Sequence, residues 1–250
     1  MGARVTLSFA VEEPPRRWRM EEEDVPETPL HDAVIRLLML ILQRWAETSE
    51  RSALVARNLG CRWDPEDARV GIDPDVALIE PAPPEADALT TLRVWREDHA
   101  PPRIAIEVVS HQNPRKDYLD APLRCARLGV EELWVFDPTL AGPEDTGGPH
   151  RLQVWRQQAN GEGPHMSRVY AGDGPARSNV LEAWLILTDD RRRLRIADDE
   201  TGERWWPTGE EAERAAREQE RAAREQERER ASRLEAKLRS LGVDPDDVTS

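Results

Sequence analysis

The chain has two cysteines and no long hydrophobic run, and each shortage excludes a class of protein. Cys61 and Cys125 are too few for a disulfide framework or a zinc cluster. The longest hydrophobic run, Leu37 to Leu42, is far shorter than the roughly 20 residues that cross a bilayer. The first residues lack the apolar core of a secretory signal. We therefore expect a cytoplasmic protein with reduced cysteines and no membrane partner.

Positive charge is also in short supply. The sequence has 35 basic and 49 acidic residues, for a formal net charge of −14, and only Lys116 and Lys237 are lysines. Proteins that grip a phosphate backbone usually show a basic face, so this total argues against broad, tight nucleic-acid binding. It does not argue against a small acidic pocket whose metal ions meet the substrate, because the distribution of charge matters more than its sum.

The composition changes twice along the chain, which predicts three parts. Residues 1–27 carry prolines and an acidic patch and are interpreted as a flexible leader, apart from a short strand expected at Val5–Phe9. Residues 28–208 hold nearly all the apolar segments and are expected to form one domain. Residues 209–250 are strongly charged and helix-forming.

Short apolar segments in residues 28–208 predict a mixed α/β fold. Thr28 and Pro29 resemble the start of a helix, and apolar residues then recur at helical spacing as far as Trp45. His31 and Asp32, near its start, are interpreted as solvated residues of the first turn. Many short strands follow, with one strand–helix–strand crossover between residues 103 and 138. We expect a mixed central sheet flanked by helices.

One carboxylate interrupts the most apolar of these strands. In IAIEVV, alternation places Ile104, Ile106 and Val108 on one face and Ala105, Glu107 and Val109 on the other. A charge within a buried strand is costly unless it is paired or binds a cation. Two interpretations stay open, a glutamate on an edge strand whose head reaches solvent, and a glutamate that points at a metal.

A second acid upstream supports the metal interpretation. Asp75 directly precedes the apolar run Val76 to Ile79. If this strand and that of Glu107 are neighbours in the sheet, the two carboxylates meet. Hard divalent cations such as Mg²⁺ bind in proteins through one or two carboxylates plus waters and a substrate phosphate.

These segments together resemble a known family. A helix near the N-terminus, then PDVALI, IAIEVVS, a polar loop with Asp117, Gly129-Val130 and ELWVFDP, follow the order and spacing of the Uma-type putative restriction endonucleases, in the PD-(D/E)XK nuclease superfamily. The similarity covers about residues 28–190. It implies a restriction-endonuclease-like fold and metal-dependent hydrolysis of phosphodiester bonds in DNA, with Mg²⁺ or Mn²⁺ bound by Asp75 and Glu107.

The resemblance also implies a lysine, and here the sequence departs from the family. Val109 stands two residues after Glu107, where the superfamily motif has lysine, and Ala121 stands where many relatives carry lysine on the next helix. Lys116 is the candidate replacement, and the alternative is an exposed loop lysine. Asp117 matches a family acid, and the alternative is a helix cap. Pro122 predicts that this helix starts late or is kinked.

The C-terminal segment contains two copies of ERAAREQ, at residues 213–219 and 220–226. Large apolar residues at coiled-coil spacing occur only near its end, at Leu234, Leu238 and Leu241. A solvated single helix and a weak coiled coil that joins two copies of the chain both fit this pattern.

Three interpretations of function follow from these observations. The first is an active endonuclease that uses Asp75, Glu107 and Lys116, and the retained acid pair favours it. The second is a nuclease fold that has lost catalysis and serves as a binding or regulatory module, which the acidic charge and Ala121 favour. The third is a scaffold that acts through assembly of its helical tail.

Overall fold

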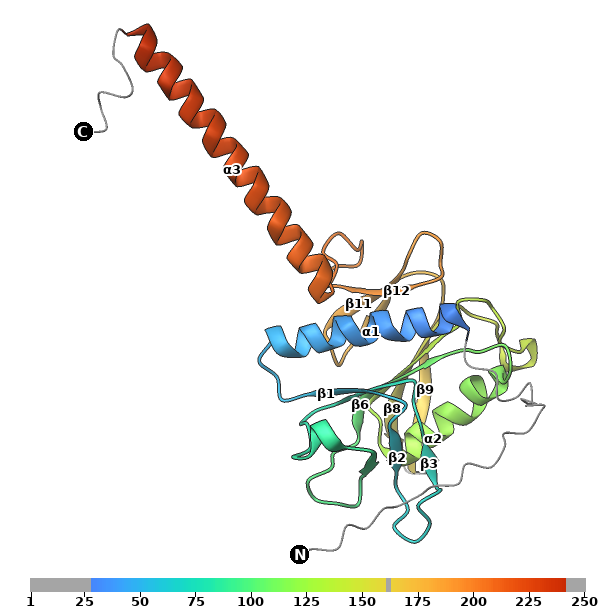
Figure 1. Ribbon diagram of the computed structural model, residues 1–250. Coiled ribbons are helices and arrows are strands. Elements are labelled where there is room, and N and C mark those ends of the chain that lie inside the picture. Colours follow the sequence, from blue (N-terminus) through green and yellow to red (C-terminus); the bar gives the residue numbers. More distant parts are fainter. Residues whose placement is uncertain (1–27, 161–162, 242–250) are drawn as a thin grey trace, which may run out of the picture.

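A six-stranded mixed sheet forms the centre of the computed structural model, which describes residues 28–160 and 163–241 (Figure 1). In sheet order its strands are β1 (Leu54–Arg57), β4 (Val76–Ile79), β6 (Pro102–Val108), β7 (Glu132–Phe136), β8 (Leu152–Asn160) and β9 (Gly163–Gly172). Strands β6 and β7 are parallel, and the other neighbours are antiparallel. The mixed α/β class expected from the sequence is confirmed. The strand expected at Val5–Phe9 lies outside the described residues.

The parallel pair is joined by the only long crossover of this sheet within the described residues. It consists of a single π-helical turn, η3 (Lys116–Asp120), followed by α2 (Ala121–Leu128). Pro122 lies in the first turn of α2, where its missing N–H breaks no helical hydrogen bond, so the helix starts late as the sequence predicted. Gly129 ends the helix in the left-handed conformation, with φ of 92°.

Alternation along β6 divides the core into two parts. On one face, Ile104, Ile106 and Val108 pack against α1 (Pro29–Thr48), which begins at the N-cap Thr28 as expected. The same core includes a small antiparallel sheet formed by β10 (Ala176–Ser178), β11 (Ala183–Leu187) and β12 (Leu194–Ala197).

The opposite face of the large sheet packs against α2. This second core includes Ala105 of β6 and both cysteines, which are free and buried as expected. A second three-stranded sheet covers part of it, formed by β3 (Gly71–Ile72), β2 (Gly60–Arg62) and β5 (Thr91–Arg93). Short 3₁₀ turns, η2 (Ala86–Ala88) and η4 (Glu144–Thr146), lie in the loops. Glu107 shares the parity of Ala105 and therefore belongs to this face.

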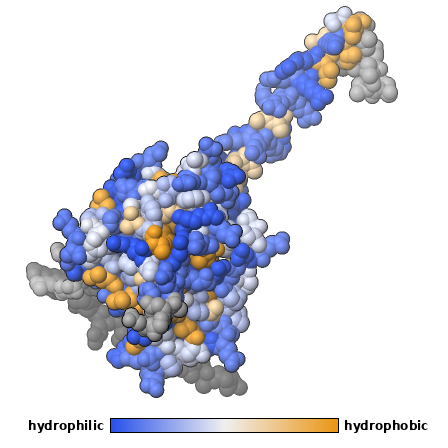
Figure 2. Space-filling view, turned by 180° about the vertical axis from the view of Figure 1, so that it is seen from behind, coloured by the Kyte–Doolittle hydropathy of each residue, from blue (hydrophilic) through white to orange (hydrophobic). Residues whose placement is uncertain are grey.

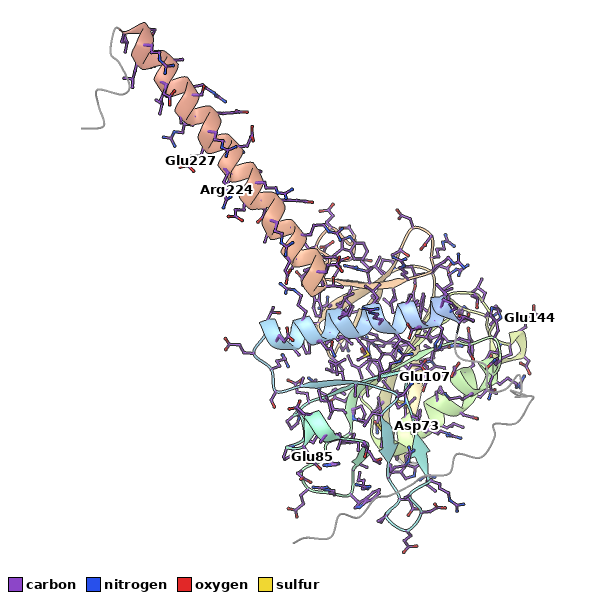
Figure 3. All side chains as sticks on the ribbon, viewed as in Figure 1. Asp73, Glu85, Glu107, Glu144, Arg224 and Glu227 are labelled. Carbon is purple, nitrogen blue, oxygen red and sulfur yellow. The ribbon has the colours of Figure 1, made fainter. Side chains whose placement is uncertain are left out.

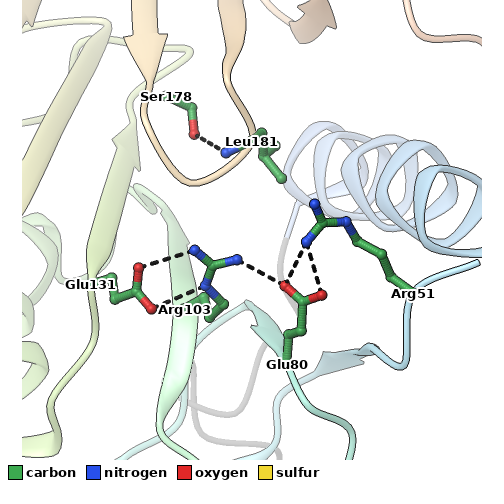
Figure 4. Close-up of polar contacts among 6 residues, drawn as sticks. All are labelled: Arg51, Glu80, Arg103, Glu131, Ser178 and Leu181. Atoms are coloured by element: carbon green, nitrogen blue, oxygen red, sulfur yellow. Dashed lines mark hydrogen bonds and ion pairs between the residues drawn. The ribbon is translucent and has the colours of Figure 1, made fainter. Parts of the chain in front are cut away.

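Ion pairs tie together the strand ends that lie far from Glu107 (Figure 4). Arg103, at the start of β6, donates to Glu80 at 2.8 Å and to Glu131 at 3.0 Å. Arg51, between α1 and β1, donates to the same Glu80 at 2.9 Å. One carboxylate thus links β4, β6 and the chain that follows α1, which leaves the other ends of these strands for a different use.

The last described helix, α3 (Gly209–Ser240), projects away from the rest of the molecule (Figure 1). Its start is fixed by a capping box between Thr208 and Glu211 and by Arg195, which donates to Glu211 at 2.8 Å. None of its residues is buried. Figure 2 shows a mostly hydrophilic shaft with hydrophobic residues near the far end, where Leu234 is 54% exposed. Within the described segments, no helix combines the length and hydrophobicity needed to cross a membrane.

Candidate active site

The structure brings Asp75 and Glu107 together where the internal strand β4 begins and its neighbour β6 ends. Strands β4 and β6 are antiparallel neighbours in which Val76 pairs with Ile106, so the next step places Asp75 opposite Glu107. Opposed residues of antiparallel strands point to the same side, with Cβ atoms about 5 Å apart. The Asp75 carboxylate accepts a hydrogen bond of 2.7 Å from the backbone N–H of Val108, which fixes its orientation.

Glu107 is fully buried in the middle of the sheet. Its exposed fraction is 0%, and β6 has a neighbouring strand on each side. The interpretation of Glu107 as an edge-strand residue that reaches solvent is therefore wrong. Within the described part of the chain, neither carboxylate oxygen of Glu107 has a hydrogen-bond partner. A buried carboxylate without hydrogen bonds is costly to keep charged, and Glu107 has an ion-pair partner in Lys116, 3.7 Å from its Oε2.

Glu132, on the adjacent strand β7, shows how this fold treats a buried acid with a structural role. Its exposed fraction is 1%. It accepts hydrogen bonds from Trp134 Nε1 at 2.9 Å, Ser178 Oγ at 2.6 Å, Asn179 N at 3.0 Å and Arg156 Nε at 3.1 Å. Two buried glutamates on neighbouring strands thus differ completely in their partners. Glu107, by contrast, has only the ion pair with Lys116 described next.

Lys116 lies over Glu107. Its ammonium nitrogen is 3.7 Å from Glu107 Oε2 and 3.9 Å from Asp117 Oδ1, and its side chain is 41% exposed. Burial lowers the pKa of Lys116, but the carboxylates of Glu107, Asp117 and Asp75 outweigh it and raise the pKa above its usual value. The lysine therefore stays charged. The interpretation of Lys116 as an exposed loop residue is wrong, since the π turn directs it to the acids.

Asp117 is a third acid of the site. Neither η3 nor α2 has a side-chain hydrogen bond at its N-cap, so the expectation that Asp117 caps a helix is wrong. Its side chain is buried and accepts a hydrogen bond from the backbone of Ser110. Burial raises the pKa of Asp117 to about 7; Lys116 opposes this shift and Asp75 adds to it.

His31 also belongs to the site, although its sequence position suggested a solvated residue. It is only 6% exposed, its Nε2 is 2.6 Å from the backbone oxygen of Val108, and the same nitrogen is 3.5 Å from Asp75 Oδ2. Asp32 does remain at the surface, paired with Arg57 at 2.5 Å. Only the docking of α1 across the end of β6 buries His31, and no local pattern signals that contact.

These side chains surround a pocket of about 290 Å³. Its wall includes His31, Asp75, Lys116 and Asp117, while Glu107 lies just beneath. The remaining lining residues are Thr28, Leu30, Val108, Val109, Ser110, His111, Gln112, Asn113, Pro138 and Thr139. Burial, with Asp75 and Asp117 nearby, raises the pKa of Glu107 well above its usual value, and Lys116 opposes this only in part. The site thus groups three acids, Asp75, Glu107 and Asp117, with one lysine, Lys116.

A second group of possible ligands lies elsewhere. Ligand atoms of Glu85, Asp98 and His99 come within 4.8 Å of one another. Figure 3 shows Glu85 well away from Glu107. Arg96 is 3.1 Å from Glu85 and 2.8 Å from Asp98, and His99 Nδ1 accepts the backbone N–H of Arg93. Both carboxylates already pair with Arg96, and the buried His99 bonds to Glu85 and to the backbone, so this group is an ion-pair network centred on Arg96.

Residues 20–190 match the model of the Uma2 family, described as "Putative restriction endonuclease". The chain belongs to this family. Among solved structures, it is similar to a putative nuclease of the DUF820 group from Anabaena variabilis, with 16% sequence identity and a TM-score of 0.41. That comparison covers 61% of this chain and 74% of the other. No curated protein matches the Uma2-family chain. Family membership supports a nuclease-like protein.

Proposed function

We propose that this Uma2-family protein is a metal-dependent DNA endonuclease that hydrolyses phosphodiester bonds at the pocket of Asp75 and Glu107. The observation that carries the proposal is the state of Glu107, fully buried with both carboxylate oxygens lacking a hydrogen-bond partner in the described segments. Carboxylate oxygens on adjacent strands are the ligands that Mg²⁺ and Mn²⁺ prefer.

The side chains divide the work by their positions. Asp75 and Glu107 would hold the ion, and the Val108 N–H keeps the Asp75 carboxylate turned toward it. A bound divalent ion supplies positive charge and a water of lowered pKa at the scissile phosphate. Lys116, charged and partly exposed, places a second positive charge beside the same site, where it offsets charge that builds on the phosphate.

One observation favours a second candidate, a nuclease fold without catalysis that acts as a binding or regulatory module. Ala121 stands where the family resemblance implies a lysine, and it is 1% exposed. In this case the pocket would still bind a divalent ion, but DNA would not be cut. Self-association through α3 belongs with this candidate and stays a prediction.

Nicking of supercoiled plasmid DNA tests the first proposal. We expect Mg²⁺- or Mn²⁺-dependent nicking by the wild type, abolished by EDTA. Asp75→Asn and Glu107→Gln should each lower the rate at least about 100-fold, because a metal ion supplies several kcal/mol of transition-state stabilisation. Asp73→Asn is a matched control, since Asp73 is exposed and pairs with Arg62 outside the pocket.

Calorimetric titration with Mn²⁺ separates the two candidates. If the wild type binds Mn²⁺, Glu107→Gln does not, and neither protein nicks any DNA tested, the result would favour the binding module over the endonuclease. Equal nicking by wild type and both acid variants would refute the proposed centre.

A further inference from the structure

Tyr118 comes from the same π turn as Lys116 and is buried in a socket of polar groups. Its side chain is 3% exposed. Its hydroxyl donates to Asp137 Oδ2 at 3.0 Å and accepts the backbone N–H of His150 at 3.1 Å. A tyrosine held at its far end fixes the backbone from which it starts, because its ring is rigid.

Two glycines give the Tyr118 ring its space. A Cβ atom on Gly142 would lie 2.2 Å from Tyr118 Cζ, and a Cβ atom on Gly148 would lie 2.8 Å from Cε1. Carbon atoms in contact stay near 3.5–4 Å, so any side chain at either position would push the ring out of place. The socket therefore accepts the ring in one position.

Asp137 connects this socket to the opposite wall of the pocket. It lies at the end of β7 and is fully buried. Besides the Tyr118 hydroxyl, it accepts the backbone N–H groups of Thr139 at 3.3 Å, Ala141 at 2.9 Å and Gly142 at 2.8 Å. The loop that it holds lines the pocket through Pro138 and Thr139. One carboxylate thus sets the distance between this loop and the π turn that carries Lys116.

We propose that Tyr118 and Asp137 form a positioning pair, which locks the π turn so that Lys116 lies over Glu107 in place of the lysine expected at Ala121. The pair does not touch the acids and acts through Lys116. The expected effect of the pair on the nicking rate rests on the proposed nuclease function. The placement of Lys116, by contrast, can be measured without any DNA.

Tyr118→Phe tests the pair with little disturbance, because phenylalanine keeps the ring in the socket and removes only the hydroxyl. The chain has two tyrosines, and Tyr170→Phe is the matched control, since the Tyr170 hydroxyl donates to Gly174 at the surface. We expect kcat for metal-dependent nicking to fall about tenfold in Tyr118→Phe, as small displacements of a reacting group do. KM for DNA and Mn²⁺ affinity should stay within about twofold of the Tyr170→Phe values.

The second measurement uses the scarcity of lysine. Limited acetylation of the full-length, DNA-free protein, followed by peptide mass spectrometry, gives the reaction rates of Lys116 and Lys237 in one sample. In the wild type, Lys116 should be acetylated more slowly than Lys237, because the Lys116 amine is held against Glu107. Tyr118→Phe should raise the Lys116-to-Lys237 ratio at least about threefold, the scale of one partly exposed ion pair. Gly142→Ala, which displaces the ring but keeps the hydroxyl, should raise it as well.

Each outcome is informative. An unchanged acetylation ratio in Tyr118→Phe and Gly142→Ala overturns the positioning pair, whether or not nicking is lost. A raised ratio in a protein whose wild type cuts no DNA supports the positioning of Lys116 and refutes the nuclease function. A raised ratio with full nicking refutes the need for Lys116 in the reaction.

Discussion

At the scale of single residues, Lys116 shows how the site departs from its family. The family resemblance implies a lysine on α2, at the position of Ala121. In the structure, the lysine beside Glu107 is instead Lys116, which comes from the π turn η3. Ala121 and Cys125 lie one turn apart on the buried side of α2, and Glu107 contributes to the raised pKa of the Cys125 thiol, after burial. Lys116 and Ala121 thus both lie on the side of the sheet that carries Glu107.

The double variant Lys116→Ala/Ala121→Lys tests this exchange. We expect Lys116→Ala to lower the nicking rate about 100-fold, as loss of one charge-stabilising donor does. Adding Ala121→Lys should restore part of the rate, measured in the same plasmid assay. Lys237→Ala, in the exposed tail, is the control. Full activity of Lys116→Ala alone would remove this lysine from the reaction.

Asp117 predicts how the metal-free protein responds to pH. Its pKa is about 7 in the folded state against 3.8 ordinarily, so between these values the folded protein binds a proton that the unfolded chain has lost. Stability from this group is therefore full below about pH 4 and is lost as pH rises through about 7. We expect the melting temperature of the wild type, relative to Asp117→Asn, to fall between pH 5 and 8 by scanning calorimetry in EDTA. A constant difference would show that Asp117 is ionised throughout.

Alternation placed Glu107 on the same face as Ala105, and the sequence predicted its meeting with Asp75 on the condition that the two strands are neighbours, which β4 and β6 are. Alternation could not predict that His31 and Asp117 also belong to the candidate site. His31 is buried by the docking of α1 on β6, and Asp117 is aimed by a π turn of five residues. Local patterns report which face a residue takes within its own element, while these two contacts depend on how separate elements pack.

At the scale of elements, Glu132 joins the small sheet to the large one. Its carboxylate on β7 accepts hydrogen bonds from Ser178 on β10 and from Asn179, which follows it. Figure 4 shows that Ser178 in turn accepts the N–H of Leu181. The contact between sheets is therefore a polar chain within a largely apolar core.

Replacement of Glu132 should destabilise the protein strongly. We expect Glu132→Ala to lower the free energy of unfolding by about 3–5 kcal/mol, since it leaves Arg156 and the buried donors unpaired. Urea unfolding followed by tryptophan fluorescence measures the change. Glu131→Ala is the neighbouring control, because Glu131 is largely exposed and its pair with Arg103 is worth less. Similar losses in both variants would contradict a structural role for the buried hydrogen bonds of Glu132.

The sequence predicted the longer elements better than the short ones. The helix from Pro29, the crossover with its late helix and the strands of the large sheet follow from periodicity and capping. Strands β2, β3 and β5 have only two or three residues, too few for a period to show. Strand β5 is held in place by its parallel pairing with β2.

At the scale of the whole molecule, α3 contributes almost nothing to the stability of the remainder. Beyond its first turn it buries no residue, and its ion pairs, such as Glu213–Arg217 at 3.3 Å, are internal to the helix. We expect removal of residues 213–250, which keeps the cap at Glu211, to change the melting temperature by less than about 2 °C, since none of the described residues in that range is buried. A larger fall would mean that the tail packs on a partner copy.

Light scattering of the same two proteins separates the alternatives for the tail. A mass that corresponds to one chain in both would leave a solvated single helix. A full-length dimer that becomes a monomer on truncation would support association through Leu234 and its neighbours near the helix end.

The 32 residues of α3 also set a fixed distance between the two ends of the helix. At a rise of 1.5 Å per residue, the helix is about 48 Å long. Its nine acidic and nine basic side chains cancel, so the arm carries no formal charge of its own while it crosses that distance. Along duplex DNA the same length corresponds to about 14 base pairs, at 3.4 Å per pair. The far end of α3 thus lies farther from its capped start at Thr208 than one turn of the double helix is long.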